Sequence, residues 1–296
     1  MRLINTTTLE LQEVFDEING PPYAILSHRW GEEELSFEEY GSGVVRDGLG
    51  YHKVLGTCAL ARHRGLEWIW IDTVCIDKRS SAELSEAINS MFRWYQRAEV
   101  CYAYLSDVRP SACHESGPSG MMREFQESAW FTRGWTLQEL IAPPEVTFLC
   151  EDWTVIGSKR SLRAQNFRSA LSSPVINGDI RRITGIPMDV LDDSVKVYQA
   201  SVAQRMSWAA NRSTTRPEDI AYCMLGLFDI NMPLLYGEGR RAFERLQTKI
   251  NSRFEDESIF AFTPMHDFVA PWQMNLYGML AVSPAEFAGC GAHQEA

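Results

Sequence analysis

The 296-residue sequence lacks a run of apolar residues long enough to cross a membrane, and residues 1–5 do not begin a secretory signal. It is also poor in positive charge. Its 28 lysines and arginines are outnumbered by 39 aspartates and glutamates, which gives a formal net charge of −11. Nucleic-acid phosphates are bound by clustered positive charge, so we expect no nucleic-acid partner. These absences predict a cytoplasmic protein without a membrane partner.

The sequence also contains no C-x-x-C pair, and its six histidines do not combine with cysteines at zinc-like spacings. Scattered cysteines in a chain of this length are typical of reduced thiols in a cytosolic protein. We therefore expect no metal site and no disulfide framework. The seven cysteines are Cys58, Cys75, Cys101, Cys113, Cys150, Cys223 and Cys290.

Three motifs that would mark a known chemistry are missing as well. There is no G-x-G-x-x-G after a strand, no G-x-x-x-x-G-K-[ST] and no G-x-S-x-G. Gly237 and Gly239 precede a helical segment, but the preceding strand and a third glycine are absent. A phosphate-transfer enzyme or a serine hydrolase is therefore not supported.

Short apolar runs do alternate with amphipathic segments between residues 20 and 150. Strands are predicted at residues 23–27, 68–72, 100–105 and 146–150, and helices at 51–64 and 82–98. This alternation predicts an α/β fold with a mostly parallel sheet flanked by helices. We assign residues 1–150 to this core.

Helical periodicity replaces the strand pattern after residue 150. It is present at residues 199–210, 217–228 and 239–253, and no Gly/Ser-rich or Pro-rich linker precedes it. We predict a helical extension, residues 151–262, packed on the core. Residues 258–262 are compatible with a last strand, and residues 263–296 are expected to be a poorly organised tail.

Polar side chains follow the predicted strands where each strand ends. In a parallel sheet these carboxyl ends meet at one edge, which is where ligands bind in open α/β folds. The sequence therefore predicts one site at this edge. The residues concerned are Ser27, His28, Arg29 and Trp30 after the first strand, Asp72 and Asp77 after the second, and Ser106 and Asp107 after the third.

Residues 130–140 predict a short helix that leads back to the same edge. Thr132 is a candidate N-cap, and Trp135 and Glu139, four residues apart, lie on one face. A carboxylate beside an indole is partly removed from water, which can perturb its pKa or direct it at a ligand. The alternative is a surface glutamate that pairs with Arg133 or with a neighbouring helix.

Three blocks of the sequence resemble the fungal HET (heterokaryon incompatibility) domain family. They are A-I-L-S-H-R-W-G at residues 24–31, W-I-D-T-V-C-I-D at 70–77 and R-G-W-T-L-Q-E at 133–139. Residues 203–209, 218–226 and 234–239 of the helical half are similar to the family as well. The resemblance extends over about residues 20–262.

HET domains in turn resemble TIR domains, and this implies a TIR/flavodoxin-like core. Ser128, Trp135 and Glu139 are similar to the TIR segment in which a serine precedes W-x-x-x-E. In enzymatic TIR domains the glutamate of this segment cleaves NAD, so the resemblance implies that Glu139 is catalytic and that NAD is a substrate, with no cofactor required.

The other residues at the edge are then candidates for substrate binding, each with a structural alternative. Trp30 or Trp135 would stack on a base or on nicotinamide, or else pack in the core. Arg29 would meet a phosphate, or pair with Asp72. The remaining candidates are Ser27, His28, which is alternatively a hydrogen-bonded histidine, and Asp72 and Asp77, which alternatively fix their loop.

Two functions are therefore considered. The first is a NAD glycohydrolase that triggers cell death in fungal incompatibility or innate immunity. The second is a non-enzymatic signalling module that self-associates or recruits a partner protein to the same end. In both cases we expect a homo-oligomer on activation.

Overall fold

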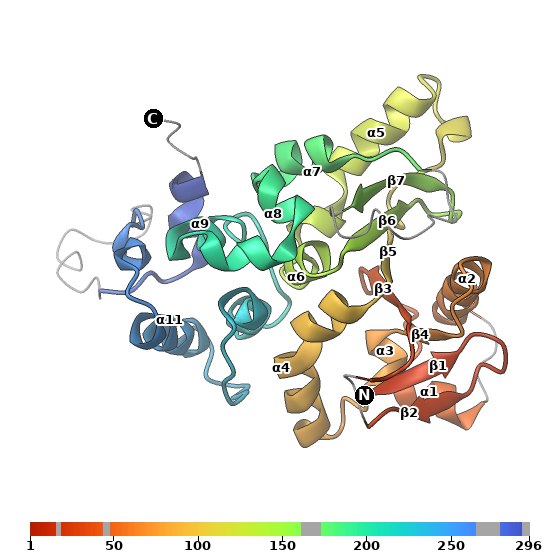
Figure 1. The fold of residues 1–296 in the computed structure, drawn as a ribbon, viewed down its shortest axis with the longest axis horizontal. Coiled ribbons are helices and arrows are strands. Elements are labelled where there is room, and N and C mark those ends of the chain that lie inside the picture. Colours follow the sequence, from red (N-terminus) through yellow and green to blue (C-terminus); the bar gives the residue numbers. More distant parts are fainter. Residues whose placement is uncertain (16–18, 44–47, 161–172, 265–278, 292–296) are drawn as a thin grey trace.

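Seven strands form a single sheet in the order β2-β1-β4-β3-β5-β6-β7 (Figure 1). The computed structural model describes residues 1–15, 19–43, 48–160, 173–264 and 279–291. Four strands at the centre are parallel to one another: β3 (Ala24–His28), β4 (Trp68–Trp70), β5 (Val100–Tyr104) and β6 (Glu145–Leu149). Every residue of β3 and β6 is buried, as expected for strands covered on both faces.

The outer strands make the sheet mixed, which corrects the prediction of a mostly parallel sheet. β1 (Arg2–Asn5) is antiparallel to both β2 (Leu11–Glu13) and β4, and β7 (Val155–Arg160) is antiparallel to β6. Antiparallel strands that follow each other need only a short turn, so the β1–β2 and β6–β7 pairs form without a crossover helix. The parallel prediction is correct only for the four central strands, and no comparison supports a TIR/flavodoxin-like topology in particular.

The helices of the core follow the predicted periodicity. The predicted helix at 51–64 is α2 (Leu49–His63), and the one at 82–98 is α4 (Ser81–Arg97). The hydroxyl of Ser80 caps α4 by accepting a hydrogen bond from the Glu83 backbone N–H at 3.3 Å. Three further helices were not predicted: α1 (Phe37–Ser42), α3 (Asp72–Cys75) and α5 (Pro118–Glu127).

The predicted helix at residues 130–140 is instead two short pieces. A 3₁₀ helix, η2 (Ala129–Thr132), is followed by an extended residue, Arg133, and then by α6 (Thr136–Ile141). Thr132 is not an N-cap, because its hydroxyl donates back to the Ala129 carbonyl at 3.0 Å. The break has a tertiary cause: Arg133 forms a parallel bridge with Ser213 in the other half of the chain.

The second half of the chain is helical, and it lies beside α4 on the side turned away from the sheet (Figure 1). The predicted helix at 217–228 is divided into α10 (Asp219–Tyr222) and η5 (Leu225–Phe228), and residues 258–262 are not a strand, because η6 (Glu257–Phe260) occupies this segment. Asp256 caps η6 by accepting a hydrogen bond from the Ser258 N–H at 3.0 Å. The other helices are α7 (Asn177–Thr184), α8 (Met188–Asp192), η4 (Ser194–Gln199), α9 (Val202–Ser207), α11 (Arg241–Arg253) and η8 (Pro284–Gly291).

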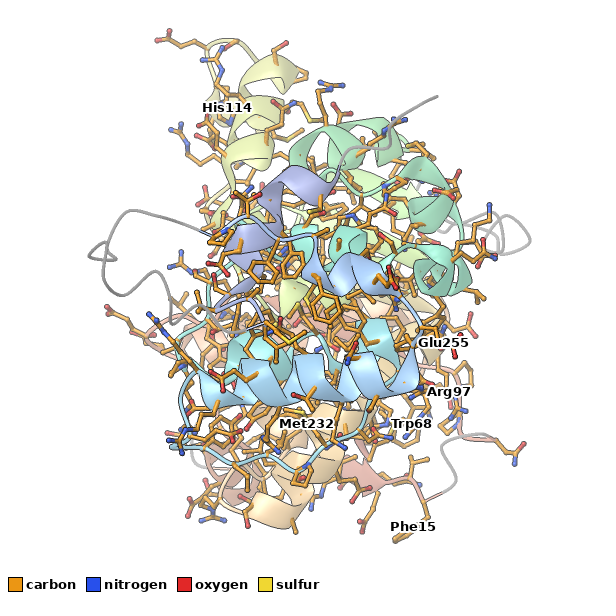
Figure 2. The ribbon with its side chains drawn as sticks, turned by 90° about the vertical axis from the view of Figure 1, so that its left-hand side faces the viewer. Phe15, Trp68, Arg97, His114, Met232 and Glu255 are labelled. Atoms are coloured by element: carbon orange, nitrogen blue, oxygen red, sulfur yellow. The ribbon has the colours of Figure 1, made fainter. Side chains whose placement is uncertain are left out.

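The two halves are joined along α4. The side-chain amide of Asn89 accepts a hydrogen bond from the Met232 N–H at 3.1 Å and donates one to the Met232 carbonyl at 3.3 Å. Figure 2 looks onto the helical half and shows Met232 just below α11. Most of the predicted tail, residues 265–278 and 292–296, lies outside the described residues.

The two halves pack closely at Gly226, and a substitution there tests this contact. A Cβ at this position would lie 2.1 Å from Cβ of Phe92 on α4, which leaves no room for a methyl group. We expect Gly226→Ala to lower the free energy of unfolding by about 1–3 kcal/mol, measured by urea denaturation. The control is Gly178→Ala in α7, where the added Cβ has no neighbour within 4 Å, so stability should be unchanged or slightly higher. Equal stability of the two variants would show that the halves do not pack this closely.

Candidate functional site

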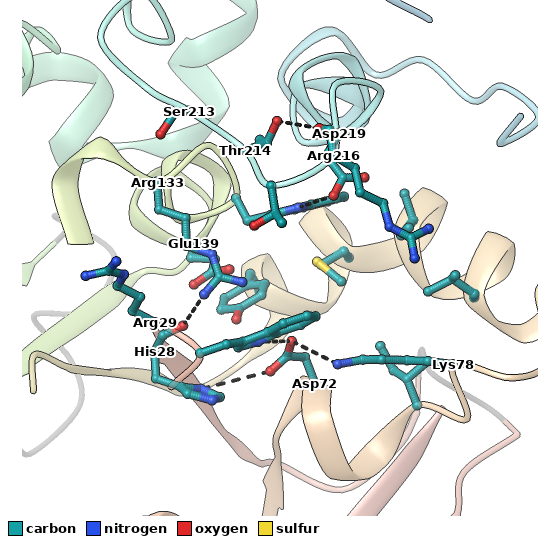
Figure 3. A pocket seen from close by; sticks show the side chains of 18 of the residues that line it. His28, Arg29, Asp72, Lys78, Arg133, Glu139, Ser213, Thr214, Arg216 and Asp219 are labelled. Atoms are coloured by element: carbon teal, nitrogen blue, oxygen red, sulfur yellow. Dashed lines mark hydrogen bonds and ion pairs between the residues drawn. The ribbon is translucent and has the colours of Figure 1, made fainter. Parts of the chain in front are cut away.

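A pocket of about 580 Å³ opens at the carboxyl end of β3, between the sheet and the helical half (Figure 3). This volume is within the usual range of small-molecule sites. The polar and aromatic residues that the core contributes are His28, Arg29, Trp30, Asp72, Lys78, Tyr95, Thr132, Arg133, Trp135 and Glu139. The helical half contributes Ser213, Thr214, Thr215, Arg216, Asp219 and Tyr236.

Glu139 lines the pocket from α6 and is 7% exposed. Its carboxylate accepts a hydrogen bond from the Ser27 hydroxyl at the end of β3. Ser27 in turn accepts a hydrogen bond from the indole N–H of Trp130 at 2.9 Å. Because Ser27 and Trp130 are fully buried, they hold one carboxylate oxygen in a fixed position.

Burial raises the pKa of Glu139 from its ordinary value of 4.5 to about 7, although Arg133 and the Ser27 hydroxyl lower it in part. Near neutral pH the group is therefore divided between the acid and the carboxylate. Among the described residues Glu139 forms no ion pair. The alternative of a surface glutamate paired with Arg133 is thus not observed.

Trp30 lies at the pocket with 46% of its surface exposed, so it is not part of the core. Its indole N–H donates to Asp72 Oδ2 at 2.9 Å. Two cations lie against its ring: the Lys78 ammonium at 3.7 Å and the Arg133 guanidinium at 5.0 Å from the ring centroid. The indole is held by polar contacts and keeps surface available for a ligand.

His28 connects β3 to the neighbouring loops. Its Nε2 lies 3.1 Å from Glu34 Oε2, and its Nδ1 lies 3.9 Å from Asp72 Oδ1. Burial alone would raise the pKa of Glu34, but hydrogen bonds from His28 and Lys53 lower it to about 2. The ring of His28 is thus fixed between two acidic side chains. This agrees with the alternative given above for His28, a hydrogen-bonded histidine.

The wall from the helical half is attached by its backbone to the segment that precedes α6. The N–H of Gly134 donates to the Ser213 carbonyl at 2.8 Å, and the N–H of Ser213 donates to the Thr132 carbonyl at 2.8 Å. The buried guanidinium of Arg212 adds hydrogen bonds to the Arg133 carbonyl at 2.9 Å and to Thr136 Oγ1 at 2.8 Å. These bonds keep the loop after Arg212 beside the helix that carries Glu139.

The far end of α6 is held in a different way. Lys159 of β7 is fully buried, and its ammonium group donates to the Ile141 carbonyl at 3.2 Å and the Pro143 carbonyl at 2.6 Å. These carbonyls have no partner within the helix, so Lys159 satisfies them. Burial lowers the pKa of Lys159 to about 7. Both ends of the helix that carries Glu139 are therefore tied to other parts of the fold.

The structure brings most of the predicted site residues together. His28, Arg29, Trp30, Asp72, Trp135 and Glu139 line the pocket, and Ser27 lies directly beneath it. Asp77 does not line the pocket, since its carboxylate accepts hydrogen bonds from the backbone and side chain of Arg79. Ser128 and Asp107 also lie outside it and bind each other at 2.8 Å.

Lys78 and the wall from the helical half were missed by the sequence analysis. Lys78 follows directly on Asp77, so the rule that selected Asp77 after the second strand could also have identified Lys78. The rule for parallel sheets says nothing about residues of the helical half. It could therefore not identify Asp219, Arg216 and Tyr236. Trp135 is linked to this wall by its indole N–H, which lies 3.4 Å from Asp219 Oδ2.

In the described part of the chain, no group of three or more His, Cys, Asp and Glu side chains is arranged to hold a metal ion. No helix there combines the length and apolar character needed to cross a membrane. All seven cysteines are free thiols.

A family comparison matches the first two of the three sequence blocks described above and ends before residues 133–139. Residues 23–119 match the family described as heterokaryon incompatibility protein (HET). The chain is also 46% identical over 233 residues to vegetative incompatibility protein HET-E-1 of Podospora anserina. This alignment covers 78% of the chain but only 16% of the relative's length. No solved structure matches the chain.

The raised pKa of Glu139 has a consequence for stability. The folded state holds this proton more tightly than the unfolded state, so wild-type stability falls as the pH rises from about 4.5 through about 7. Glu139→Gln removes this titration. Its free energy of unfolding relative to wild type should therefore increase between pH 4.5 and pH 8, by on the order of 3 kcal/mol.

Urea denaturation of both proteins across this pH range measures the difference. The control is Glu244→Gln on the exposed side of α11, whose effect on stability should be small beside that of Glu139→Gln. A difference between Glu139→Gln and wild type that is constant with pH would mean that Glu139 is ionised throughout and not effectively buried.

Proposed function

This chain belongs to the heterokaryon incompatibility (HET) family, and from that premise we propose that it is a cell-death effector of fungal incompatibility that cleaves NAD at the nicotinamide–ribose bond. The observation that carries the proposal is Glu139, a single buried carboxylate fixed at the wall of a pocket of ligand size. The chain spans 16% of the length of HET-E-1, so the activity and the partners of any larger protein are part of the proposal.

The chemistry needs little more than a carboxylate. In NAD cleavage the bond between ribose C1′ and the ring nitrogen breaks, and its electron pair neutralises the pyridinium. The leaving group is then neutral nicotinamide and needs no proton, unlike the alcohol released by ordinary glycosidases. Water adds its oxygen to C1′ and gives up one proton, so NAD and water yield ADP-ribose, nicotinamide and a proton.

Glu139 would act by stabilising the positive charge that develops on the ribose as the bond breaks. A preorganised charge in a dry site is effective because it does not have to reorient during the reaction. Ser27 and Trp130 provide this preorganisation by fixing one carboxylate oxygen. The other oxygen accepts no hydrogen bond from the described residues, so it can face the ribose. A pyridinium ring bound nearby would also favour the charged form of Glu139.

Trp30 is the side chain best suited to stack on a cationic ring. Its indole already attracts the Lys78 ammonium at 3.7 Å, and a pyridinium would take the place of this ammonium on the ring. Asp72 fixes the plane of the indole through its hydrogen bond to the indole N–H.

Replacing Glu139 tests the proposal directly. We expect Glu139→Gln to reduce nicotinamide release from NAD by on the order of 10²–10³ and to abolish toxicity on expression, with the fold retained. Glu244→Gln should match wild type in both assays. If the wild-type chain kills without releasing nicotinamide, also when it is forced to oligomerise, the non-enzymatic module that recruits a partner takes the place of the enzyme.

The pH dependence of the reaction provides a second test. The carboxylate form of Glu139 is the active one, and its pKa in the free protein is about 7. We therefore expect kcat/KM for nicotinamide release to rise with pH and to level off above about 7. A rate that is constant from pH 5.5 to pH 8.5 would show that the titration of Glu139 does not control the step.

A further inference from the structure

The mouth of the pocket carries positive charge although the chain as a whole is acidic. Its lysine and arginine side chains are Arg29, Lys78, Arg133 and Arg216, while its acidic side chains are Asp72, Asp219 and Glu139. Burial raises the pKa of Glu139 to about 7, so this carboxyl group is partly protonated at neutral pH, while burial lowers the pKa of Lys78. The formal charge of the whole chain is −11. A positive opening in an acidic protein favours entry of an anionic ligand.

Two of these cations are bound to no acidic side chain or carbonyl in the described part of the chain. Within the described residues, neither the Arg29 nor the Arg216 guanidinium forms an ion pair or donates a hydrogen bond. Lys78 is 3.8 Å from Asp72, and Arg133 donates to the His28 carbonyl at 3.0 Å, so both of these are engaged. Figure 3 shows Arg29 and Arg216 on opposite sides of the pocket, with Glu139 between them.

Arg216 is held in place, unlike an ordinary surface arginine. Its guanidinium lies 4.5 Å from the ring centroid of Tyr236, whose hydroxyl donates to Asp219 Oδ1 at 2.9 Å. Its backbone carbonyl accepts a hydrogen bond from the Thr214 hydroxyl at 2.6 Å. A guanidinium packed on a ring keeps its N–H groups free at the edge, in the forked arrangement that binds phosphate oxygens.

We infer that Arg216 binds the diphosphate of a nucleotide ligand, so that the helical half selects the substrate while the core cleaves it. The inference rests on the proposed function, because it names the part of NAD that the mouth of the pocket recognises. It also assigns a role to the backbone bridge between Arg133 and Ser213, here called the joint, because this bridge brings Arg216 to the site.

The test compares ligands with and without a diphosphate. Calorimetry with ADP and with adenosine measures the contribution of the phosphates to binding by the 296-residue chain. We expect ADP to bind more tightly than adenosine, and we expect Arg216→Gln to weaken ADP binding by roughly 10- to 100-fold without changing adenosine binding.

The matched control is Arg181→Gln on α7, an exposed arginine away from the pocket whose loss changes the net charge by the same amount. The melting temperature of each variant should equal that of wild type. The inference is wrong if ADP binds no more tightly than adenosine, or if Arg216→Gln and Arg181→Gln behave alike.

Substrate cleavage separates this inference from the proposed function. If NAD and nicotinamide riboside are cleaved equally well and Arg216→Gln has no effect, the cleavage is real and the phosphate role of Arg216 is wrong. If no nicotinamide is released but ADP binding depends on Arg216, the phosphate site is real and the cleavage is wrong.

Discussion

A carboxyl group removed from water must receive hydrogen bonds or keep its proton, and the site is arranged around how Glu139 meets this requirement. Ser27 donates to it from the end of β3, and Trp130 fixes Ser27 from the neighbouring 3₁₀ helix. Three separate segments must therefore meet at one point. Because each of these groups is almost fully buried, a change in Ser27 or Trp130 alters the pKa of Glu139 as well as the packing around it.

The joint between Arg133 and Ser213 is the second constraint on the shape of the pocket. Arg133 pairs with Ser213 in the helical half, so the backbone cannot stay helical there, and α6 begins only at Thr136. The same joint requires a glycine at residue 134, where a Cβ would lie 2.5 Å from Cγ2 of Thr214. Close backbone approach is thus what places the loop from the helical half at the pocket.

Short-range patterns were enough to predict the central strands, α2, α4 and the residues at the carboxyl ends of the strands. Those features depend on apolar periodicity and on a geometric rule for parallel sheets. The β1–β2 hairpin was missed because only Leu3 and Ile4 of β1 are buried, too few to give a pattern. The wall around Arg216 could not be predicted, since a joint between residues 133 and 213 has no local signature.

The pairing of residues 133 and 213 also sets the order in which the pocket can form as the chain is synthesised. The strands that support Glu139 are complete once residue 149 has emerged, but the wall that contains Arg216 and Tyr236 follows almost 90 residues later. Until then Arg133 lacks its bridge partner and the pocket lacks one side. Until residue 236 has been synthesised, the chain therefore lacks a complete binding site, although the strands that support Glu139 are already present.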